Sequence, residues 1–259
     1  MKDTLLFLGT GAADWKMEHK QTHPDFRRCC AALVNDDLLI DCGPHIFDFA
    51  ESCGRPDLYD RVTDILVTHS HSDHFRAETV LRLAEKQKIR LICDRFTRQK
   101  VGEHENITFL HLSPYKKRRI GRYRVTPLLA NHDEITTRTK KAYHYIIETP
   151  NGREIFYGLD GAWLLRPSWK EMLLHTYDLM VFDCTVGDSD DWRLFEHNTI
   201  PMLRKMIAEI KEKNLLRENG KLVASHMART LHISHEDTAN ILAQMDMIAA
   251  YDGLQIDLE

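Results

Sequence analysis

Short apolar runs recur along the whole chain, and turn-forming residues separate most of them. The runs are rich in β-branched and aromatic residues, which is typical of buried strands. Residues 35–37 (Asn-Asp-Asp) and 150–152 (Pro-Asn-Gly) lie between paired runs and predict hairpin turns. The predicted strands are Thr4–Leu8, Ala31–Val34, Leu38–Asp41, Asp64–Thr68, Ile89–Cys93, Ile107–Leu112, Tyr123–Leu129, Tyr143–Glu148, Glu154–Leu159, Leu179–Cys184, Leu222–Ser225 and Leu254–Leu258.

Helical spacing of apolar positions is found at about residues 76–86, 198–213 and 235–247. Thr199 and Ser234 stand where the second and third of these helices would need an N-cap. Early hairpins followed by alternating strands and helices predict sheets with helices packed outside them. Because no repeat or linker-like segment interrupts the pattern, we expect one domain over residues 1–259.

The composition, with 43% hydrophobic and 29% charged residues, is that of an ordinary globular protein. A net charge of −4 argues against general attraction to nucleic acid, and no stretch approaches the roughly 20 apolar residues of a membrane helix. The first apolar run follows Asp3 and continues into a Gly-rich turn, so we interpret it as a strand and not as a signal peptide. The six cysteines form no CxxC pair, which predicts reduced thiols in a cytoplasmic protein.

Polar side chains stand where several predicted strands end. Since ligand sites in such proteins form at the carboxyl ends of strands, we expect these side chains to meet at one rim. The chain also has 15 histidines, a high number that directs attention to metal chemistry. The residues at the strand ends are His69, His132, Asp160, Cys184 and His226.

The segment after the fourth predicted strand reads His-Ser-His-Ser-Asp-His and carries the clearest chemical signal. Alternation places His69 and His71 on one side of an extended segment, whereas Asp73 and His74 point elsewhere after the turn, so two adjacent metals can be served. Imidazole and carboxylate ligands suit zinc, manganese or iron. A lone histidine is usually structural, but three histidines and an aspartate at these offsets rarely arise by accident.

This segment resembles the HxHxDH signature of the metallo-β-lactamase-fold hydrolases. The resemblance extends to the Leu-Ile-Asp-Cys-Gly strand end at residues 39–43, and to His132, Asp160 and His226 in the family's order. It implies an α/β fold of four layers, an αβ/βα sandwich with two sheets face to face and helices outside. It also implies two metal ions.

By this resemblance one metal is bound by three histidines and the other by an aspartate and two histidines, with Asp160 between them. Two divalent ions close together repel, so a shared carboxylate and a bridging hydroxide are needed, and the metal pair lowers the pKa of that water. An aspartate in place of cysteine argues against the antibiotic-cleaving members. The implied ligands are His69, His71 and His132 for the first metal, and Asp73, His74 and His226 for the second.

Several neighbours of these residues have open roles. We prefer His226 to His232 and His235 as the last ligand, because His226 stands at the end of a predicted strand. His235 is expected in the first turn of a helix. His232 could support a ligand or contact the substrate. Asp41 and Asp183 are expected to orient ligand imidazoles, the alternative being turn capping.

The candidate catalytic residues are His197 and Asp73, the latter also a ligand. Residues 196–199 (Glu-His-Asn-Thr) resemble a segment of the phosphonate-pathway cyclic phosphodiesterases, and an imidazole there suits general acid work; the alternative is a surface histidine at a helix start. Only 27 residues separate His132 from Asp160, so the long arm of the ribonuclease Z group is not expected.

Residues 12–28 contain no cysteine, so the extra structural zinc of the phosphonate-pathway enzymes is not expected. The arginines near the motifs either neutralise a substrate phosphate or lie on the surface, and the tryptophans either line a pocket or pack. These residues are Arg27, Arg28 and Arg229, and Trp15, Trp163 and Trp192.

The resulting functional hypothesis is a binuclear metal-dependent hydrolase, a phosphodiesterase that uses a metal-bridging hydroxide on small or cyclic phosphodiesters. The expected cofactors are two divalent ions, zinc or manganese, with iron also accepted. A carboxyl-ester, thioester or lactone hydrolase is the enzymatic alternative, a metal-binding protein without catalysis is weaker, and di-iron redox chemistry is weaker still. The expected partner is a small-molecule phosphodiester, without nucleic acid or membrane, and a homodimer is left open.

Overall fold

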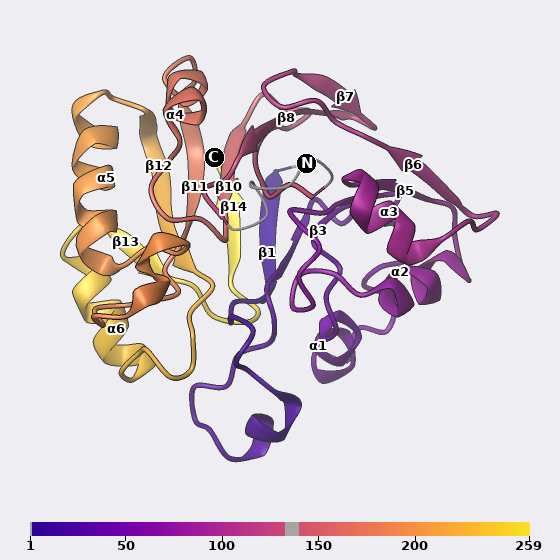
Figure 1. Cartoon of the computed structure of the whole chain (residues 1–259), viewed down its shortest axis with the longest axis horizontal. Helices are drawn as coiled ribbons and strands as arrows, with labels where there is room; N and C mark the ends of the chain where they lie inside the picture. Colours follow the sequence, from indigo (N-terminus) through magenta and orange to yellow (C-terminus); the bar gives the residue numbers. More distant parts are fainter. Residues whose placement is uncertain (1, 133–139) are drawn as a thin grey trace.

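Two seven-stranded sheets lie face to face in the computed structural model, which describes residues 2–132 and 140–259. Helices cover the outer face of each sheet, so the chain forms four layers (Figure 1). Helices α5 and α6 cover the second sheet, and α1, α2 and α3 lie against the first. The α/β sandwich of four layers expected from the sequence is therefore confirmed.

The first sheet has the strand order β14-β1-β2-β3-β4-β5-β6. Strands β3 to β6 run parallel to one another, and the remaining neighbours are antiparallel. Its strands are β1 (Asp3–Gly9), β2 (Ala31–Val34), β3 (Leu38–Ile40), β4 (Asp64–Leu66), β5 (Ile89–Ile92), β6 (Ile107–Leu110) and β14 (Gln255–Leu258).

The second sheet has the order β13-β12-β11-β10-β9-β8-β7, with β10 to β13 parallel. Its strands are β7 (Arg118–Ile120), β8 (Tyr123–Leu129), β9 (Tyr143–Glu148), β10 (Glu154–Gly158), β11 (Tyr177–Asp183), β12 (Leu216–Ser225) and β13 (Met247–Ala249). The helices are η1 (Met17–Gln21), α1 (Ile46–Ser52), α2 (Ala77–Ala84), α3 (Arg95–Val101), α4 (Arg166–Met172), η3 (Trp192–Phe195), α5 (Ile200–Glu212) and α6 (His235–Ala243).

Most of the strands are buried on both faces, so their residues alternate between two hydrophobic clusters instead of between core and water. In β11, Leu179 and Val181 pack into the cluster between the sheets, whereas Met180 and Phe182 pack outward against helices. The same division explains why these strands read as continuous apolar runs in the sequence.

Both predicted hairpin turns are confirmed. Asn35 and Asp36 have φ values of 50° and 67° between β2 and β3, the left-handed pair that tightly turned hairpins require. Gly152 has φ 76° between β9 and β10. The predicted N-caps are confirmed as well, because the side chains of Thr199 and Ser234 accept hydrogen bonds from backbone N–H groups of α5 and α6.

The helix predicted at residues 235–247 is shorter than expected. It ends at Ala243, a turn with Asp246 at φ 61° follows, and Met247–Ala249 pair with Leu222–Ala224 of β12 as strand β13. The backbone of Met247–Ala249 forms hydrogen bonds with the edge of β12, and a longer helix would prevent this pairing. The short elements α1, α3, α4 and β7 were not predicted. In the described part of the chain, no helix has both the length and the apolar character needed to cross a membrane.

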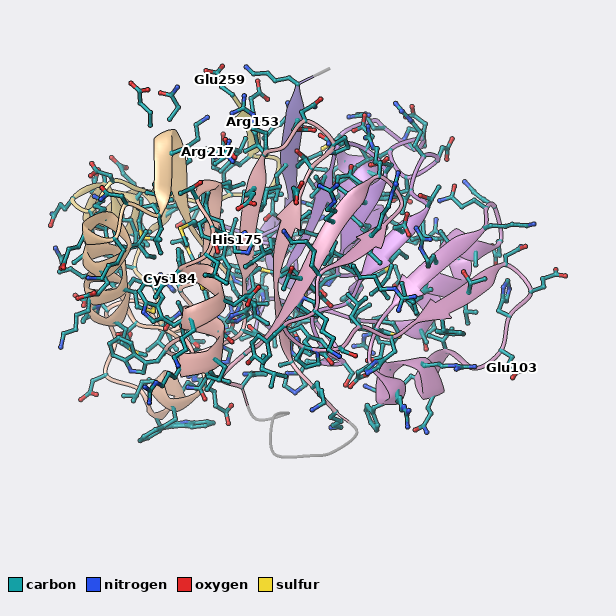
Figure 2. All side chains as sticks on the ribbon, turned by 90° about the horizontal axis from the view of Figure 1, so that it is seen from above. Glu103, Arg153, His175, Cys184, Arg217 and Glu259 are labelled. Atoms are coloured by element: carbon teal, nitrogen blue, oxygen red, sulfur yellow. The ribbon has the colours of Figure 1, made fainter. Side chains whose placement is uncertain are left out.

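The view from above places Cys184 beside the α5 layer and Glu103 at the opposite end of the molecule (Figure 2). Cys184 is fully buried in the outer cluster of the second sheet. Its expected place among the polar groups of the rim is therefore wrong, because the alternation along β11 turns its thiol toward the helices.

Candidate metal centre

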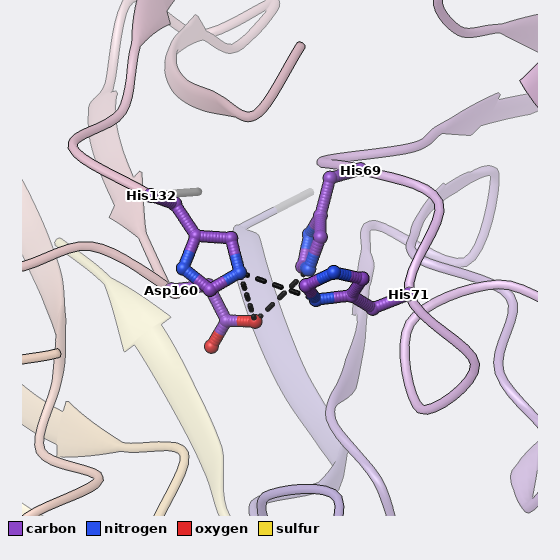
Figure 3. Close-up of side chains that lie close together, drawn as sticks. All are labelled: His69, His71, His132 and Asp160. Atoms are coloured by element: carbon purple, nitrogen blue, oxygen red, sulfur yellow. Dashed lines mark hydrogen bonds and ion pairs between the residues drawn. The ribbon is translucent and has the colours of Figure 1, made fainter. Parts of the chain in front are cut away.

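The carboxyl ends of β4, β8, β10 and β12 deliver polar side chains to one place between the two sheets. His69, His71, Asp73 and His74 follow β4, whereas His132, Asp160 and His226 follow the other three strands. Four of them, His69, His71, His132 and Asp160, point toward one another (Figure 3). The structure thus brings together all seven residues that the sequence analysis put forward as ligands.

Three histidines and one aspartate form the first group. The Nε2 atom of His132 lies 3.2 Å from Nδ1 of His71 and 3.9 Å from Oδ2 of Asp160. The Nε2 atom of His69 lies 3.0 Å from the same oxygen. All four potential ligand atoms lie within 4.8 Å of one another, a spacing that a single ion can serve.

Asp160 belongs to the second group as well, with Asp73, His74 and His226. Its Oδ2 lies 3.1 Å from His74 Nε2, and its Oδ1 lies 2.9 Å from His226 Nε2. The Nε2 atoms of His74 and His226 are 3.0 Å apart. Both oxygens of Asp160 thus face ligand nitrogens, which is the arrangement expected of a carboxylate shared between two sites.

Hydrogen bonds from outside each group set the orientation of the imidazoles. The Nδ1 atom of His74 lies 2.7 Å from Asp41 Oδ2, and that of His226 lies 2.7 Å from Thr185 Oγ1. The Thr185 hydroxyl donates to Asp183, so it accepts from His226, and His74 donates to a carboxylate. With Nδ1 protonated, the Nε2 lone pair of each ring is directed into the group.

Thr68 does the same for the third imidazole. Its hydroxyl donates to Asp41 and lies 3.1 Å from Nδ1 of His69. Asp41 therefore orients ligand imidazoles, as expected: it binds His74 directly, and it binds His69 through the Thr68 hydroxyl.

The buried polar atoms fit a divalent cation. His69 Nε2 and Asp160 Oδ1 are buried and make no hydrogen bond among the described residues, although each has an oppositely polarised atom nearby. Buried polar groups are normally satisfied, so each such exception calls for a partner. Imidazole nitrogens and carboxylate oxygens converging from several strands are a donor set for zinc, manganese or iron.

The pKa shifts of the site residues also indicate that a cation binds here. Burial acts to lower the pKa of His226, but the Asp160 carboxylate outweighs it and raises that pKa to about 10. Burial acts to raise the pKa of Asp160, but the His226 and His74 imidazoles hold it well below its usual range. Since carboxylates stay ionised here, positive charge is required between them, and a divalent ion supplies it in exchange for protons.

Backbone geometry at the site is unusual. Asp41, Asp160 and His226 have φ values of 63°, 52° and 59°, which place them in the left-handed region although none is glycine. Each follows the end of a strand, so this conformation turns its side chain out of the sheet direction. At Gly43 an added Cβ would lie 2.2 Å from the carbonyl oxygen of Asp73, so only glycine allows the histidine loop to approach this closely.

His197 stands beside the second group without belonging to the predicted ligands. Its Nδ1 lies 2.8 Å from Asp183 Oδ2, and its ring stacks on that of His226 with centroids 5.7 Å apart. Burial acts to lower its pKa, but the Asp183 carboxylate outweighs it and raises the pKa above the ordinary value. A cleft of about 250 Å³ opens here, and its lining includes five of the seven predicted ligands together with Glu196 and His197.

The other residues singled out in the sequence lie outside the cleft or on its rim. His232 Nε2 lies 2.6 Å from the carbonyl oxygen of Cys184, and His235 begins α6, 2.8 Å from the Arg27 guanidinium. Arg27 and Arg28 are buried, so the surface position is wrong for them, and neither is in the described lining of the cleft. Arg28 pairs with Asp48 and Asp252.

Of the tryptophans, Trp15 is buried, Trp163 is partly exposed, and Trp192 lines the cleft. Arg229 is bound by Asp14 through its backbone N–H.

The sequence analysis missed the supporting threonines and the cleft carboxylate. Thr68 and Thr185 precede or follow strand-end residues that were noticed, but a threonine there has no motif of its own. Glu196 offers a carboxylate oxygen within 4.8 Å of ligand atoms of His132 and His197. The signal available for Glu196 was only its place next to His197.

Comparison with known proteins places the chain in a family. The model of the β-lactamase superfamily domain matches residues 37–250. The metallo-β-lactamase fold protein YhfI from Bacillus subtilis has a TM-score of 0.74 at 13% identity, covering 99% of this chain and 100% of its own. A search of curated proteins finds no significant match.

Two further solved structures have the same TM-score of 0.74. A diphosphatase from the PhnP family is 18% identical, with 99% of this chain and 97% of that one covered. Zinc-bound PqqB from Methylobacterium extorquens is 16% identical, with 98% and 100% covered. The fold is thus the metallo-β-lactamase fold, and the site is a candidate metal centre. The chain belongs to the β-lactamase superfamily, as its motifs indicated.

Proposed function

We propose that this hydrolase cleaves small or cyclic phosphodiesters with two divalent metal ions, zinc or manganese. The observation that carries the proposal is His197, an imidazole held by Asp183 beside the metal centre but outside its predicted ligands. One of the structurally similar proteins is a diphosphatase, which supports chemistry at a phosphate group. In this proposal one ion is held by His69, His71, His132 and Asp160, and the other by Asp73, His74, His226 and Asp160.

Ions bound at these residues would supply an activated water and positive charge against the developing charge on phosphate oxygens. The chain's own contribution to proton transfer is His197. Because Nδ1 faces Asp183, the remaining nitrogen, Nε2, is left for the cleft that the ring lines. The Asp183 carboxylate raises the pKa of His197 and so favours the protonated imidazole, the form that can donate a proton to the departing oxygen.

The charges of the cleft favour a small substrate with a single negative charge. Its described lining contains the carboxylates of Asp14 and Glu196 besides the predicted ligands. Arg193 is the one guanidinium in that lining, and it is paired with Asp191. A polyanion such as nucleic acid would meet these carboxylates without a free guanidinium to balance them, so we propose a small-molecule diester.

The test is hydrolysis by zinc- and manganese-loaded protein of two diesters with different leaving groups. Bis-p-nitrophenyl phosphate releases a weakly basic phenolate, whereas a 2′,3′-cyclic nucleotide releases a strongly basic alkoxide that needs a proton. His197→Ala should lower kcat/KM for the cyclic nucleotide by about 10²–10⁴-fold, and that for the nitrophenyl ester much less.

His104→Ala is the matched control, because His104 is a histidine at the far end of the molecule next to Glu103. It should leave both rates unchanged. The proposal is wrong if protein carrying two metals per chain cleaves neither diester. Faster turnover of lactones or thioesters than of either diester, with His197 dispensable, would also contradict it and favour carbonyl chemistry.

A further inference from the structure

Two of the most exposed large apolar side chains of the described residues lie on the four-residue helix η3. Trp192 is 69% exposed and Phe195 is 75% exposed. The helix directly precedes the Glu196–His197 segment, so these side chains stand beside the candidate catalytic residue. Of the two, Trp192 lines the cleft and Phe195 is not part of its lining.

The same cleft is lined by small side chains from elsewhere in the chain. Ala12 and Ala13 follow β1, and Ala228 follows the ligand His226. Methyl groups at these positions leave the cleft open beside the Trp192 indole. An indole in water next to open space provides a flat apolar surface on which a planar group can stack.

Hydrogen bonds fix the chain on both sides of Trp192. The Asp191 side chain accepts a hydrogen bond from the backbone N–H of Arg193 at 2.9 Å. It also receives the Arg193 guanidinium at 2.8 and 3.0 Å through two nitrogens. At the other end, His197 is anchored by Asp183. Because both ends are fixed, less conformational entropy is lost when a ligand binds the exposed residues between them.

We propose that Trp192 stacks on a planar aromatic group of the substrate, which makes the substrate an aryl or nucleoside phosphodiester and not an alkyl one. The inference rests on the proposed function, because the metal centre has to hold the phosphate while the indole holds the aromatic group. Stacking of a base on an aromatic side chain corresponds to about a 5- to 150-fold gain in affinity.

The experiment measures binding by calorimetry to the full-length zinc-loaded protein, so it does not depend on which diester is cleaved. The probes are ethyl phosphate, phenyl phosphate and thymidine 5′-monophosphate. Phenyl phosphate should bind at least about 5-fold more tightly than ethyl phosphate. Trp192→Ala should abolish this preference, and Trp192→Phe should retain most of it. Tighter binding of the thymidine ester than of the phenyl ester would identify the nucleoside class.

Phe195→Ala is the matched control, since it removes an equally exposed aromatic group from the same helix but not from the cleft. It should leave the preference intact, and zinc content and melting temperature show that each variant is folded. Equal binding of phenyl and ethyl phosphate, or a preference that survives Trp192→Ala, overturns the inference and leaves phosphodiester cleavage standing. If no phosphate ester binds at all, the proposed function itself fails.

Discussion

The histidine loop, residues 68–74, and the η3 segment, residues 191–197, face the same cleft but differ in burial and in hydrogen bonding. His69 and His74 are fully buried, and Asp41 and Lys100 bond to the loop from outside. The η3 segment is held at its two ends by Asp191 and Asp183, and its aromatic side chains are exposed. Substitutions near the loop should therefore change metal binding, and those near η3 should change substrate binding.

Asp160→Ala should have the largest effect, because this carboxylate faces both histidine groups. We expect loss of both metals and a fall in phosphodiesterase activity of at least about 10³-fold, since bound metal ions lower the activation barrier by several kcal/mol. Metal content per chain and kcat/KM measure the two effects. Asp178→Asn, another buried carboxylate that binds Arg153 away from the site, is the control and should keep its metals.

Asp41→Asn should weaken metal binding by about 10- to 100-fold, because the amide no longer fixes the His74 tautomer as a carboxylate does. Competition with a chelator measures the affinity. Asp64→Asn serves for comparison, since Asp64 is equally buried on the same sheet but binds Arg90. Equal losses of affinity in the two variants would mean that the loop responds to general destabilisation and not to the loss of an orienting bond.

Metal-free protein should lose stability as pH rises. The pKa of His226 is raised from 6.5 to about 10, so the folded state gains stability from its protonation fully below pH 6.5, and loses it as pH approaches 10. At acidic pH the depressed pKa of Asp160 has the opposite effect. The ionised carboxylate contributes stability above about pH 4, and this stability is lost as pH falls.

We expect the melting temperature of chelator-treated protein to fall by several degrees between pH 6.5 and 10. His226→Gln should flatten this part of the profile. A wild-type curve that is level over the same range would show that the cluster carries no proton without metal.

Asp191→Ala should have the smallest effect. It removes the carboxylate that caps η3 and pairs with Arg193, but it touches none of the predicted ligands. We expect metal content to stay the same and KM for an aryl diester to rise roughly threefold, with kcat little changed. A loss of metal in this variant would show that η3 and the histidine loop are not independent.

The arrangement of the fold was predictable because its main signals are local. Apolar runs, the turn residues at 35–37 and the Thr199 cap each determine a nearby element. The end of α6 was not predictable from residues 235–247 alone, because the partner of Met247–Ala249 is the distant edge of β12.

The site divides in the same way. Histidines and aspartates at strand ends have a recognisable spacing, and the structure brings them together. The contacts of Thr68 with Asp41 and of Thr185 with His226, like the buried position of Arg27, join segments far apart in the chain. No spacing in the sequence encodes such contacts, so they become visible only in three dimensions.

The left-handed backbone of Asp41, Asp160 and His226 has a consequence for attempts to engineer this protein. Such a conformation costs a non-glycine residue free energy that glycine would largely recover. A screen that rewards heat resistance alone should therefore collect glycine at these three positions. The most heat-resistant variants from such a screen would therefore have lost side chains on which the chemistry of the site depends.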